Sequence, residues 1–404
     1  MNHLSYLEKL LEGIEVVWFP IREVTERTTN IKWRETSKSH QYIDLTSVSI
    51  DTKKIIETTE VGSSNAPSRA QKLVKRDDVL FATTRPTQMR YCLIDEEYDG
   101  AVASTGYCVL RVKKEVTLPK WILHLISSSD FKKYLEENQS GSAYPAISDA
   151  KVKDFSIPIP CPDNPEKSLE IQAEIVRILD AFTAMTAELT AELTAELNMR
   201  KKQYNYYRNQ LLSFDEANVE WKSLGKLAEN LDSKRKPITS GQREPGNIPY
   251  YGASGIVDYV KDFIFDGDFL LVSEDGANLL ARNTPIAFSI SGKNWVNNHA
   301  HVLKFETYAE RRYVEYYLNS IDLTPYISGA AQPKLNKKNL NSISIPNPSL
   351  EEKERIVSIL DKFHTLTTSI SDGLPREIEL RKKQYGYYRD LLLSFPQSNS
   401  DEAA

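Results

Sequence analysis

The segment Trp295–His301 carries a His-x-His pattern beside two adjacent asparagines, a combination that suits either metal binding or base recognition. Two imidazoles do not complete a metal site, and no further ligands lie near them in the sequence. We therefore predict packed or hydrogen-bonded histidines and no metal. The alternative function of the segment lies in Asn297 and Asn298, because an asparagine amide pairs with both N6 and N7 of adenine.

Arginine offers a second route to base recognition, because its guanidinium forks onto guanine or holds a phosphate. Arg85 and Arg90 are candidates for this role, although surface arginines more often do neither. Four polar, turn-prone segments are of the kind that forms such a surface: Ala82–Pro86, Gly141–Pro145, Tyr250–Ser254 and Gly329–Lys334. The candidate nucleic-acid contacts are Thr83, Thr84, Arg85, Arg90, Tyr144, Tyr250, Tyr251, Ser254, Lys293, Asn297, Asn298, Gln332 and Lys334.

Catalytic motifs are missing from the sequence. It has no GxxxxGK[ST] phosphate loop, no strand-bound GxGxxG, no NPPY-type methyltransferase tetrapeptide and no nucleophile elbow. Asp51–Lys53 has the Asp-x-Lys spacing of many nuclease sites, but such a triplet is expected by chance among 56 acidic residues. The three cysteines are scattered and odd in number, which favours reduced, packed thiols. We predict that the chain has no catalytic residues of its own.

The charge distribution permits nucleic-acid binding only locally. The net charge is −5, but Trp18–Ile157 has 21 basic and 19 acidic residues, and Trp221–Ile345 has 15 and 13. The remaining segments hold 15 basic and 24 acidic residues. The two larger regions are therefore mildly basic, which is compatible with local DNA-binding patches.

The chain repeats itself once. Arg200–Phe214 returns as Arg381–Phe395 with 12 of 15 residues identical, and Ile175–Asp180 returns as Ile356–Asp361 at the same offset of 181. Weaker similarity frames the regions before each repeat, from the tryptophans at 18 and 221 to the Ser-Ile-Pro segments at 156 and 344. Shared frames around dissimilar interiors indicate two modules that do one job on two different targets.

The expected fold class is α+β, with two mixed α/β domains separated by two long, paired, coiled-coil-like helices in a pseudo-two-fold repeat. The helices are expected at Ser168–Phe214 and, interrupted at Asp372–Pro375, from the capping box of Ser349 and Glu352 onward. Inside the domains we expect strands at Asp78–Phe81, Tyr107–Val112, Asp268–Val272 and Ala300–Phe305, and helices at Pro119–Leu135 and Tyr308–Asn319. The predicted division is a helical segment 1–17, domains at 18–157 and 221–345, and helical regions at 158–220 and 346–404.

The tetrapeptide TAEL occurs three times in tandem over Thr186–Leu197. Ala, Glu and Leu are good helix formers, which explains the composition but not the perfect repeat. Four residues add roughly 6 Å and about 40° of rotation to a helix, whereas one DNA base pair adds roughly 3.4 Å and about 35°. We interpret the repeat as an adjustable ruler formed by Thr186, Leu189, Thr190, Leu193, Thr194 and Leu197.

Both repeats contain the basic and aromatic sequence RKKQYxYYRxxLLSF. One interpretation is a helix C-terminus with favourable charges and packed tyrosines. The other is the docking of a partner subunit, which would then bind twice. The candidate docking residues are Arg200, Lys201, Lys202, Tyr204, Tyr207, Arg381, Lys382, Lys383, Tyr385 and Tyr388.

The TAEL repeats and the segment from NPEKSLEIQ to RKKQYNYYR make the chain resemble the specificity subunits of type I restriction-modification systems, in particular the type IC group. Ile248–Leu280 looks like one recurrent class of recognition domain, and Asp77–Pro86 with Ala103–Arg111 looks like another. The resemblance implies that each domain reads one half of a split, asymmetric site in double-stranded DNA. It also implies that the helices set the gap and bind two methyltransferase subunits, and that two restriction subunits join them. S-adenosylmethionine, ATP and magnesium would belong to those partners and not to this chain.

Two rival hypotheses are a stand-alone enzyme and a coiled-coil scaffold that reads no DNA. The first lacks a catalytic constellation, and the second leaves two large, dissimilar modules unexplained. A polar N-terminus and the absence of a long apolar run indicate a cytoplasmic protein without membrane contact.

Overall fold

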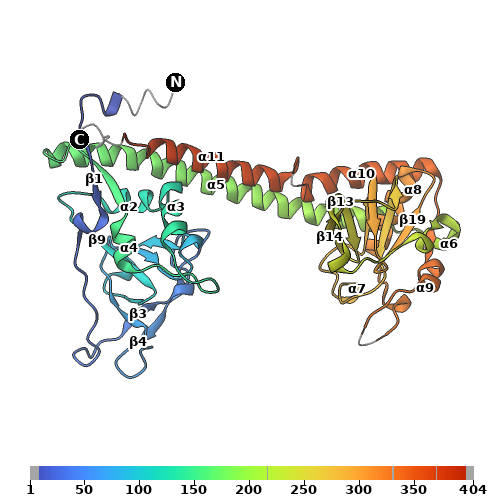
Figure 1. Ribbon diagram of the computed structural model, residues 1–404, viewed down its shortest axis with the longest axis horizontal. Helices are drawn as coiled ribbons and strands as arrows, with labels where there is room; N and C mark the ends of the chain where they lie inside the picture. Colours follow the sequence, from blue (N-terminus) through green and yellow to red (C-terminus); the bar gives the residue numbers. More distant parts are fainter. Residues whose placement is uncertain (1–8, 216, 330–331, 370, 397–404) are drawn as a thin grey trace. The chain divides into compact units, whose positions relative to one another are not determined.

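The computed structural model describes residues 9–215, 217–329, 332–369 and 371–396, which form two compact units. Unit 1 comprises Met1–Ala191 and Glu379–Ala404, and unit 2 comprises Glu192–Ile378. Three helices supply the helical part of both units: α5 (Pro165–Leu211), α10 (Leu350–Thr368) and α11 (Leu374–Leu392). Helix α5 crosses from unit 1 into unit 2 along the chain, and α11 crosses back (Figure 1).

Unit 1 contains two four-stranded sheets and a closing strand pair. The pair joins β1 (Val16–Pro20) to β10 (Ser156–Pro160) in antiparallel fashion. One sheet is antiparallel, with the order β2 (Thr25–Glu26), β9 (Tyr107–Val112), β6 (Val79–Ala82), β7 (Tyr91–Leu93). The other has the order β4 (Thr59–Val61), β3 (His40–Ile43), β8 (Val102–Ser104), β5 (Ala70–Leu73), and in it β3 and β8 are parallel.

Unit 2 repeats this topology strand for strand. Its closing pair is β11 (Trp221–Ser223) with β20 (Ser344–Pro346). The antiparallel sheet has the order β12 (Glu229–Asn230), β19 (Ala300–Lys304), β16 (Phe269–Ser273), β17 (Ala287–Ile290). The mixed sheet has the order β14 (Gly255–Val260), β13 (Pro245–Gly252), β18 (Lys293–Val296), β15 (Phe265–Asp266), with β13 and β18 parallel. Two sequences with dissimilar interiors therefore share one fold.

Shorter helices complete each unit. Unit 1 has α2 (Pro119–Leu125), α3 (Ser129–Asn138) and α4 (Asp149–Asp154), and unit 2 has α6 (Leu224–Leu227), α7 (Asn278–Ala281), α8 (Tyr308–Ser320) and α9 (Lys337–Ser342). The prediction of a single helix at Pro119–Leu135 was wrong. The chain turns after α2, and the Ser128 hydroxyl caps α3 by accepting from the Phe131 N–H at 3.2 Å.

The interrupted second helix is confirmed: α10 ends at Thr368 and α11 begins at Leu374. The Ser349 hydroxyl accepts from the Glu352 N–H at 3.2 Å, as the capping pattern predicts. The first copy is one continuous helix of 47 residues. It begins at Pro165, three residues before the predicted Ser168, and ends at Leu211, three residues before the predicted Phe214. Pro165 therefore starts the helix and does not precede it, because a proline is tolerated in the first turn, where its missing N–H would have no intrahelical partner.

The ends of the two repeated helices are exchanged between the units. In unit 1 the core joins Ile175 and Leu179 of the first repeat to Leu393 and Phe395 of the second. In unit 2 the core joins Ile356 and Leu360 of the second repeat to Leu212 of the first, with Phe214 packed against it. The domain of each unit thus packs on the start of the helix that follows it and on the end of the other repeat.

Candidate nucleic-acid interface

Three segments of unit 1 meet beyond the end of β6 and are joined by backbone hydrogen bonds. The Thr83 N–H donates to the Gly106 carbonyl at 2.8 Å, and the Arg85 N–H donates to the Pro145 carbonyl at 2.7 Å. The Ile147 N–H closes the arrangement by donating to the Thr83 carbonyl at 2.9 Å. We call this arrangement the loop junction of unit 1, formed by residues 83–90, 104–106 and 140–147.

Unit 2 makes the same three bonds with different residues. The Glu274 N–H donates to the His299 carbonyl at 2.9 Å, the Gly276 N–H to the Pro333 carbonyl at 3.2 Å, and the Leu335 N–H to the Glu274 carbonyl at 2.7 Å. The loop junction of unit 2 is formed by residues 274–282, 297–299 and the described part of 328–335. Because the backbone is matched, Asp275 occupies the place of Thr84 and His299 that of Gly106.

A glycine turn is required in both junctions. Gly141 and Gly329 have φ angles of 93° and 84°, a left-handed conformation that favours glycine. An added Cβ would lie 2.9 Å from the Tyr144 carbonyl oxygen at the first and 2.5 Å from the Gln332 carbonyl oxygen at the second. This geometry explains why the sequence frames both domains with the same Gly-x-x-x-Pro pattern.

The unit 1 junction exposes one cation and one aromatic ring. Arg85 has a φ of 50°, and its guanidinium lies 5.6 Å from the ring centre of Tyr144, which is 73% exposed. Among the described residues, the Arg85 guanidinium forms no ion pair. Met89 also has a positive φ of 53°. Left-handed non-glycine residues cost free energy and concentrate at functional sites.

The other candidates in unit 1 are divided between the surface and the loop framework. Thr84 is half-buried beside Arg85, whereas Thr83 is buried and its hydroxyl donates to the Gly106 carbonyl at 2.9 Å. The Arg90 guanidinium donates to the Leu45 carbonyl and to the Val48 carbonyl, the latter at 2.7 Å. Arg90 therefore anchors the loop that presents Arg85.

The unit 2 junction is built on buried charges. Glu274 is 8% exposed, and its carboxylate binds Arg235 at 2.7 Å and Lys334 at 3.1 Å. Burial alone would raise the pKa of Glu274, but the hydrogen bond from Arg235, the nearby His301 and the hydrogen bond from Lys334 together hold its pKa below the usual value. The carboxylate is therefore ionised at neutral pH and orients Lys334.

The two histidines of the His-x-His pattern have different environments. His301 is fully buried, with Nδ1 2.6 Å from the Asp232 carboxylate and Nε2 2.7 Å from the Leu335 carbonyl oxygen. His299 is exposed, and its Nδ1 lies 2.9 Å from both carboxylate oxygens of Asp275. The expectation of hydrogen-bonded histidines matches these contacts. In the part of the chain that the structure describes, no group of three potential ligands is arranged for a metal ion.

Two candidates in unit 2 lie inside the domain. Tyr250 is fully buried, and its hydroxyl accepts from the Ile238 N–H at 2.9 Å. Asn297 is buried, and its Oδ1 accepts from the His299 N–H at 2.8 Å. Each of these polar groups accepts from the backbone of a loop, which supports a role in holding the loops in place.

The remaining candidates in unit 2 are surface side chains. Ser254 lies at the β13–β14 turn, whose Ala253 carbonyl accepts from the Ser273 hydroxyl just before Glu274. Asn298 and Gln332 are exposed within the loop junction itself. Two candidates lie elsewhere on the mixed sheet: Tyr251 is half-buried, and Lys293 has its ammonium 4.6 Å from the ring centre of Phe263.

The repeated basic and aromatic segment both packs and faces solvent. Tyr207 stacks on Phe363 at 5.6 Å between ring centres, and the equivalent Tyr388 lies 6.1 Å from Phe182. Tyr204 packs against the core of unit 2, and the Tyr385 hydroxyl lies 2.8 Å from that of Thr183. The remaining docking candidates are the exposed Lys201, Lys202, Lys382 and Lys383 and the half-buried Arg200 and Arg381.

Sequence reasoning missed the most exposed tyrosines of this segment. Tyr206 is 60% exposed and its equivalent Tyr387 is 66% exposed. Their identical position in the two copies of the repeat could have indicated them as docking candidates. In the TAEL region, Leu189, Leu193 and Leu197 are half-buried, as are Thr186 and Thr190, whereas Thr194 is exposed.

A polar clamp fastens each domain to its helix at an equivalent aspartate. In unit 1, Asp180 binds Lys120 at 2.6 Å and the buried His124 at 2.9 Å. In unit 2, Asp361 binds Tyr316 at 2.6 Å and Arg312 at 2.7 Å. Burial lowers the pKa of His124, so its imidazole favours the neutral form.

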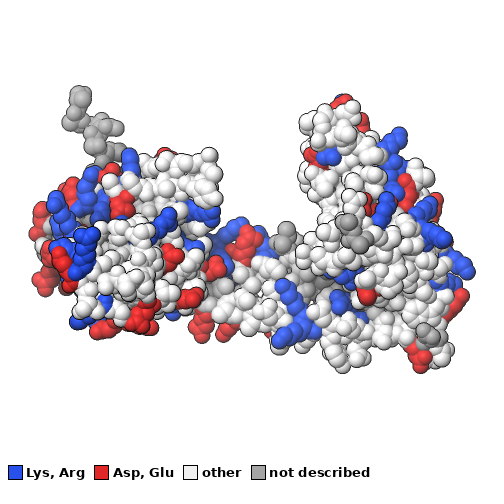
Figure 2. Space-filling model, turned by 90° about the horizontal axis from the view of Figure 1, so that it is seen from below, with Lys and Arg blue, Asp and Glu red and all other residues white. Residues whose placement is uncertain are grey.

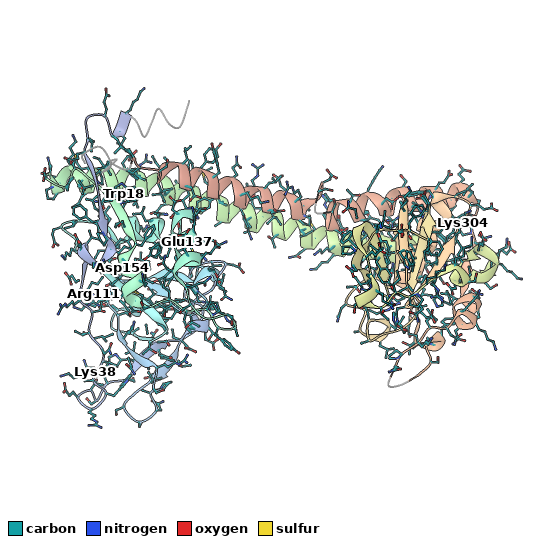
Figure 3. The ribbon with its side chains drawn as sticks, viewed as in Figure 1. Trp18, Lys38, Arg111, Glu137, Asp154 and Lys304 are labelled. Atoms are coloured by element: carbon teal, nitrogen blue, oxygen red, sulfur yellow. The ribbon has the colours of Figure 1, made fainter. Side chains whose placement is uncertain are left out.

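The surface has no large area of a single charge in the view of Figure 2, where basic and acidic side chains are mixed on both units. Figure 3 labels Trp18, which lies beside the helices of unit 1 and donates from its indole N–H to the Pro396 carbonyl at 3.2 Å. Within the described ranges, no helix is both long enough and apolar enough to cross a bilayer.

Comparison with known proteins identifies this two-unit arrangement. The family model described as the type I restriction modification DNA specificity domain matches residues 21–199 and again residues 217–380. The chain belongs to this family. The two matched ranges begin near the starts of the two recognition domains, so each of the two modules is recognised separately.

The similarity extends over whole chains. The chain is 38% identical to the EcoR124I/EcoR124II specificity subunit of Escherichia coli, with 98% of each covered. It is 36% identical to the EcoprrI specificity subunit of the same species, with 92% of this chain and 93% of the relative covered. It is thus the DNA-recognition subunit of a type I restriction-modification complex, and such subunits are not catalytic.

Solved structures show the same fold at low identity. A chain from a study of assembly and conformational transition of a type I system aligns over 94% of this chain with a TM-score of 0.71 and 22% identity. The HsdS subunit of Thermoanaerobacter tengcongensis aligns over 94% with a TM-score of 0.56 and 23% identity. The mixed α/β fold with long helices is therefore confirmed.

Proposed function

We propose that this specificity subunit reads a bipartite, asymmetric site in double-stranded DNA, with unit 1 reading one half and unit 2 the other through their loop junctions. The observation that carries the proposal is the shared backbone of the two junctions, which hold different side chains on the same three hydrogen bonds. One framework with two chemistries is what two readers of different base sequences need, because bases are distinguished by donors, acceptors and methyl groups.

The partners follow from the repeated helix ends. Two methyltransferase subunits dock, one on each copy of the basic and aromatic segment, where Tyr206 and Tyr387 are 60% and 66% exposed. Two restriction subunits complete the complex. S-adenosylmethionine, ATP and magnesium bind to these partners, which act in the cytoplasm. The TAEL repeats support assignment to the type IC group.

A domain exchange tests the division of labour. Trp221–Ile345 is replaced by the corresponding domain of a relative with another specificity, and the variant is expressed with its methyltransferase. Methylome sequencing of the host should show that one half of the methylated motif changes while the other half stays. A change in both halves would contradict the proposed modularity.

A further inference from the structure

The two loop junctions present opposite hydrogen-bonding groups at adjacent positions of their shared backbone. In unit 1 the exposed group is the Arg85 guanidinium, which only donates. In unit 2 the equivalent of Arg85 is Gly276, which has no side chain, and the preceding Asp275 carries a carboxylate, whose oxygens accept hydrogen bonds. The side chain of Asp275 is 33% exposed, and that of His299 is 51% exposed.

The carboxylate of Asp275 is held in place. The Nδ1 of His299 lies 2.9 Å from each of its oxygens, and the Asp275 backbone forms a bridge with Lys334. The His299 carbonyl and the Asn297 amide fix the turn that carries the imidazole. An acceptor on a rigid support discriminates bases well, because little side-chain entropy is lost when it binds.

Resting on the proposed function of unit 2 as a half-site reader, we propose that Asp275, positioned by His299, recognises a cytosine in that half-site. In the major groove, cytosine presents the N4 amine as a donor, and a carboxylate is its natural acceptor. Adenine also presents an amine, but its N7 acceptor lies beside it and repels a carboxylate. Thymine and guanine present oxygen acceptors at this edge and are rejected in the same way.

The Lys334 ammonium does not neutralise the Asp275 carboxylate. This ammonium is bound to Glu274 at 3.1 Å, and Glu274 in turn binds Arg235. Arg235 and Lys334 are thus paired with the buried carboxylate of Glu274, and the Arg282 guanidinium donates to the Leu318 carbonyl at 3.4 Å. This leaves the outer carboxylate of Asp275 as the acidic side chain that faces the surface among the described residues of the junction.

The test is methylome sequencing of a host that expresses the complete complex with Asp275→Asn. An asparagine keeps an acceptor for His299 and adds a donor, so we expect one C·G pair of the second half-site to relax and to admit A·T. Discrimination at that pair should fall by roughly 5- to 150-fold, with the first half-site and the spacer unchanged. The matched control is Asp262→Asn, an exposed aspartate beyond the opposite end of β14, which should leave the motif intact.

His299→Ala separates positioning from contact. It removes the support but not the acceptor, so we expect the same pair to relax less than in Asp275→Asn. If Asp275→Asn methylates the unchanged motif, or relaxes only an A·T pair, the inference is wrong. If Asp275→Asn gives no methylation, Asp275→Glu decides: a motif that retains the cytosine supports the inference, and one relaxed elsewhere overturns it. A wild-type complex without a bipartite motif would instead refute the proposed function of the chain.

Discussion

Deleting one TAEL unit shortens α5 between two points where it is anchored. Phe182 contacts Tyr388 in unit 1, and Tyr207 stacks on Phe363 in unit 2. The continuous helix between Phe182 and Tyr207 advances about 1.5 Å per residue, or roughly 37 Å, and the deletion reduces this length to roughly 31 Å. The far end also turns back by about 40°. Losing one base pair changes DNA by roughly 3.4 Å and about 35° in the same sense.

The second helical region offers a place to absorb the change, because α10 and α11 are separate helices with a break after Thr368. We therefore expect the deletion variant to keep both half-sites and to favour a spacer one base pair shorter. The excess in rise, roughly 6 Å against 3.4 Å, must be taken up by helix tilt or DNA distortion, so affinity should fall.

Methylome sequencing of the host measures the spacer directly. Alanine at Glu188, Glu192 or Glu196 is the control, since it preserves helix length and should leave the spacer unchanged. An active deletion variant that methylates the parent spacer would refute the ruler and leave TAEL as an ordinary helical sequence.

Three further outcomes are expected. A chain cut after Phe214 should pair with a second copy, because its own repeat end can replace the nearly identical end at 381–395. The resulting complex should methylate a symmetric site. Preference for the asymmetric parent site would argue against this pairing. Arg85→Ala should relax one G·C pair of the first half-site by roughly 5- to 150-fold. Weaker methylation of every site with an unchanged motif would show a phosphate contact instead. Because burial lowers the pKa of His124, the folded chain binds this proton less readily than the unfolded chain, so stability is full above about pH 6.5 and is lost as the pH falls below it. His124→Gln should flatten that slope in thermal unfolding between pH 7.5 and 5.5, and an equal slope would exclude His124 as its source.

Much of the local structure could be predicted from the sequence because the patterns were strong. β9 covers the predicted Tyr107–Val112, and α8 extends the predicted Tyr308–Asn319 by one residue. The break between α2 and α3 within Pro119–Leu135 was harder to predict, since Ser128 serves as a helix cap only once the chain has turned. Apolar spacing alone cannot show such a turn.

The candidate site was only partly predictable. A loop rich in polar residues indicates a surface, but it does not show which side chains point outward. Tyr250 on β13 and Asn297, which directly follows β18, are both buried. Asp275 was not predicted, because its equivalence to Thr84 exists in the backbone and not in the residue types. The exchange of helix ends between units was also hidden, because a repeat shows which segments are equivalent and not which domain each one contacts.

The exchanged helix ends have a consequence for how new specificities arise. Each domain is gripped by a segment encoded next to the other domain, and that segment is nearly the same in both copies. A recognition domain from another subunit, if it has the same flanking segments, therefore packs on nearly the same helix end at either position. Genetic exchange within the repeated segments can then replace one recognition domain without changing the surface on which it packs. New DNA specificities therefore arise by recombination of whole domains.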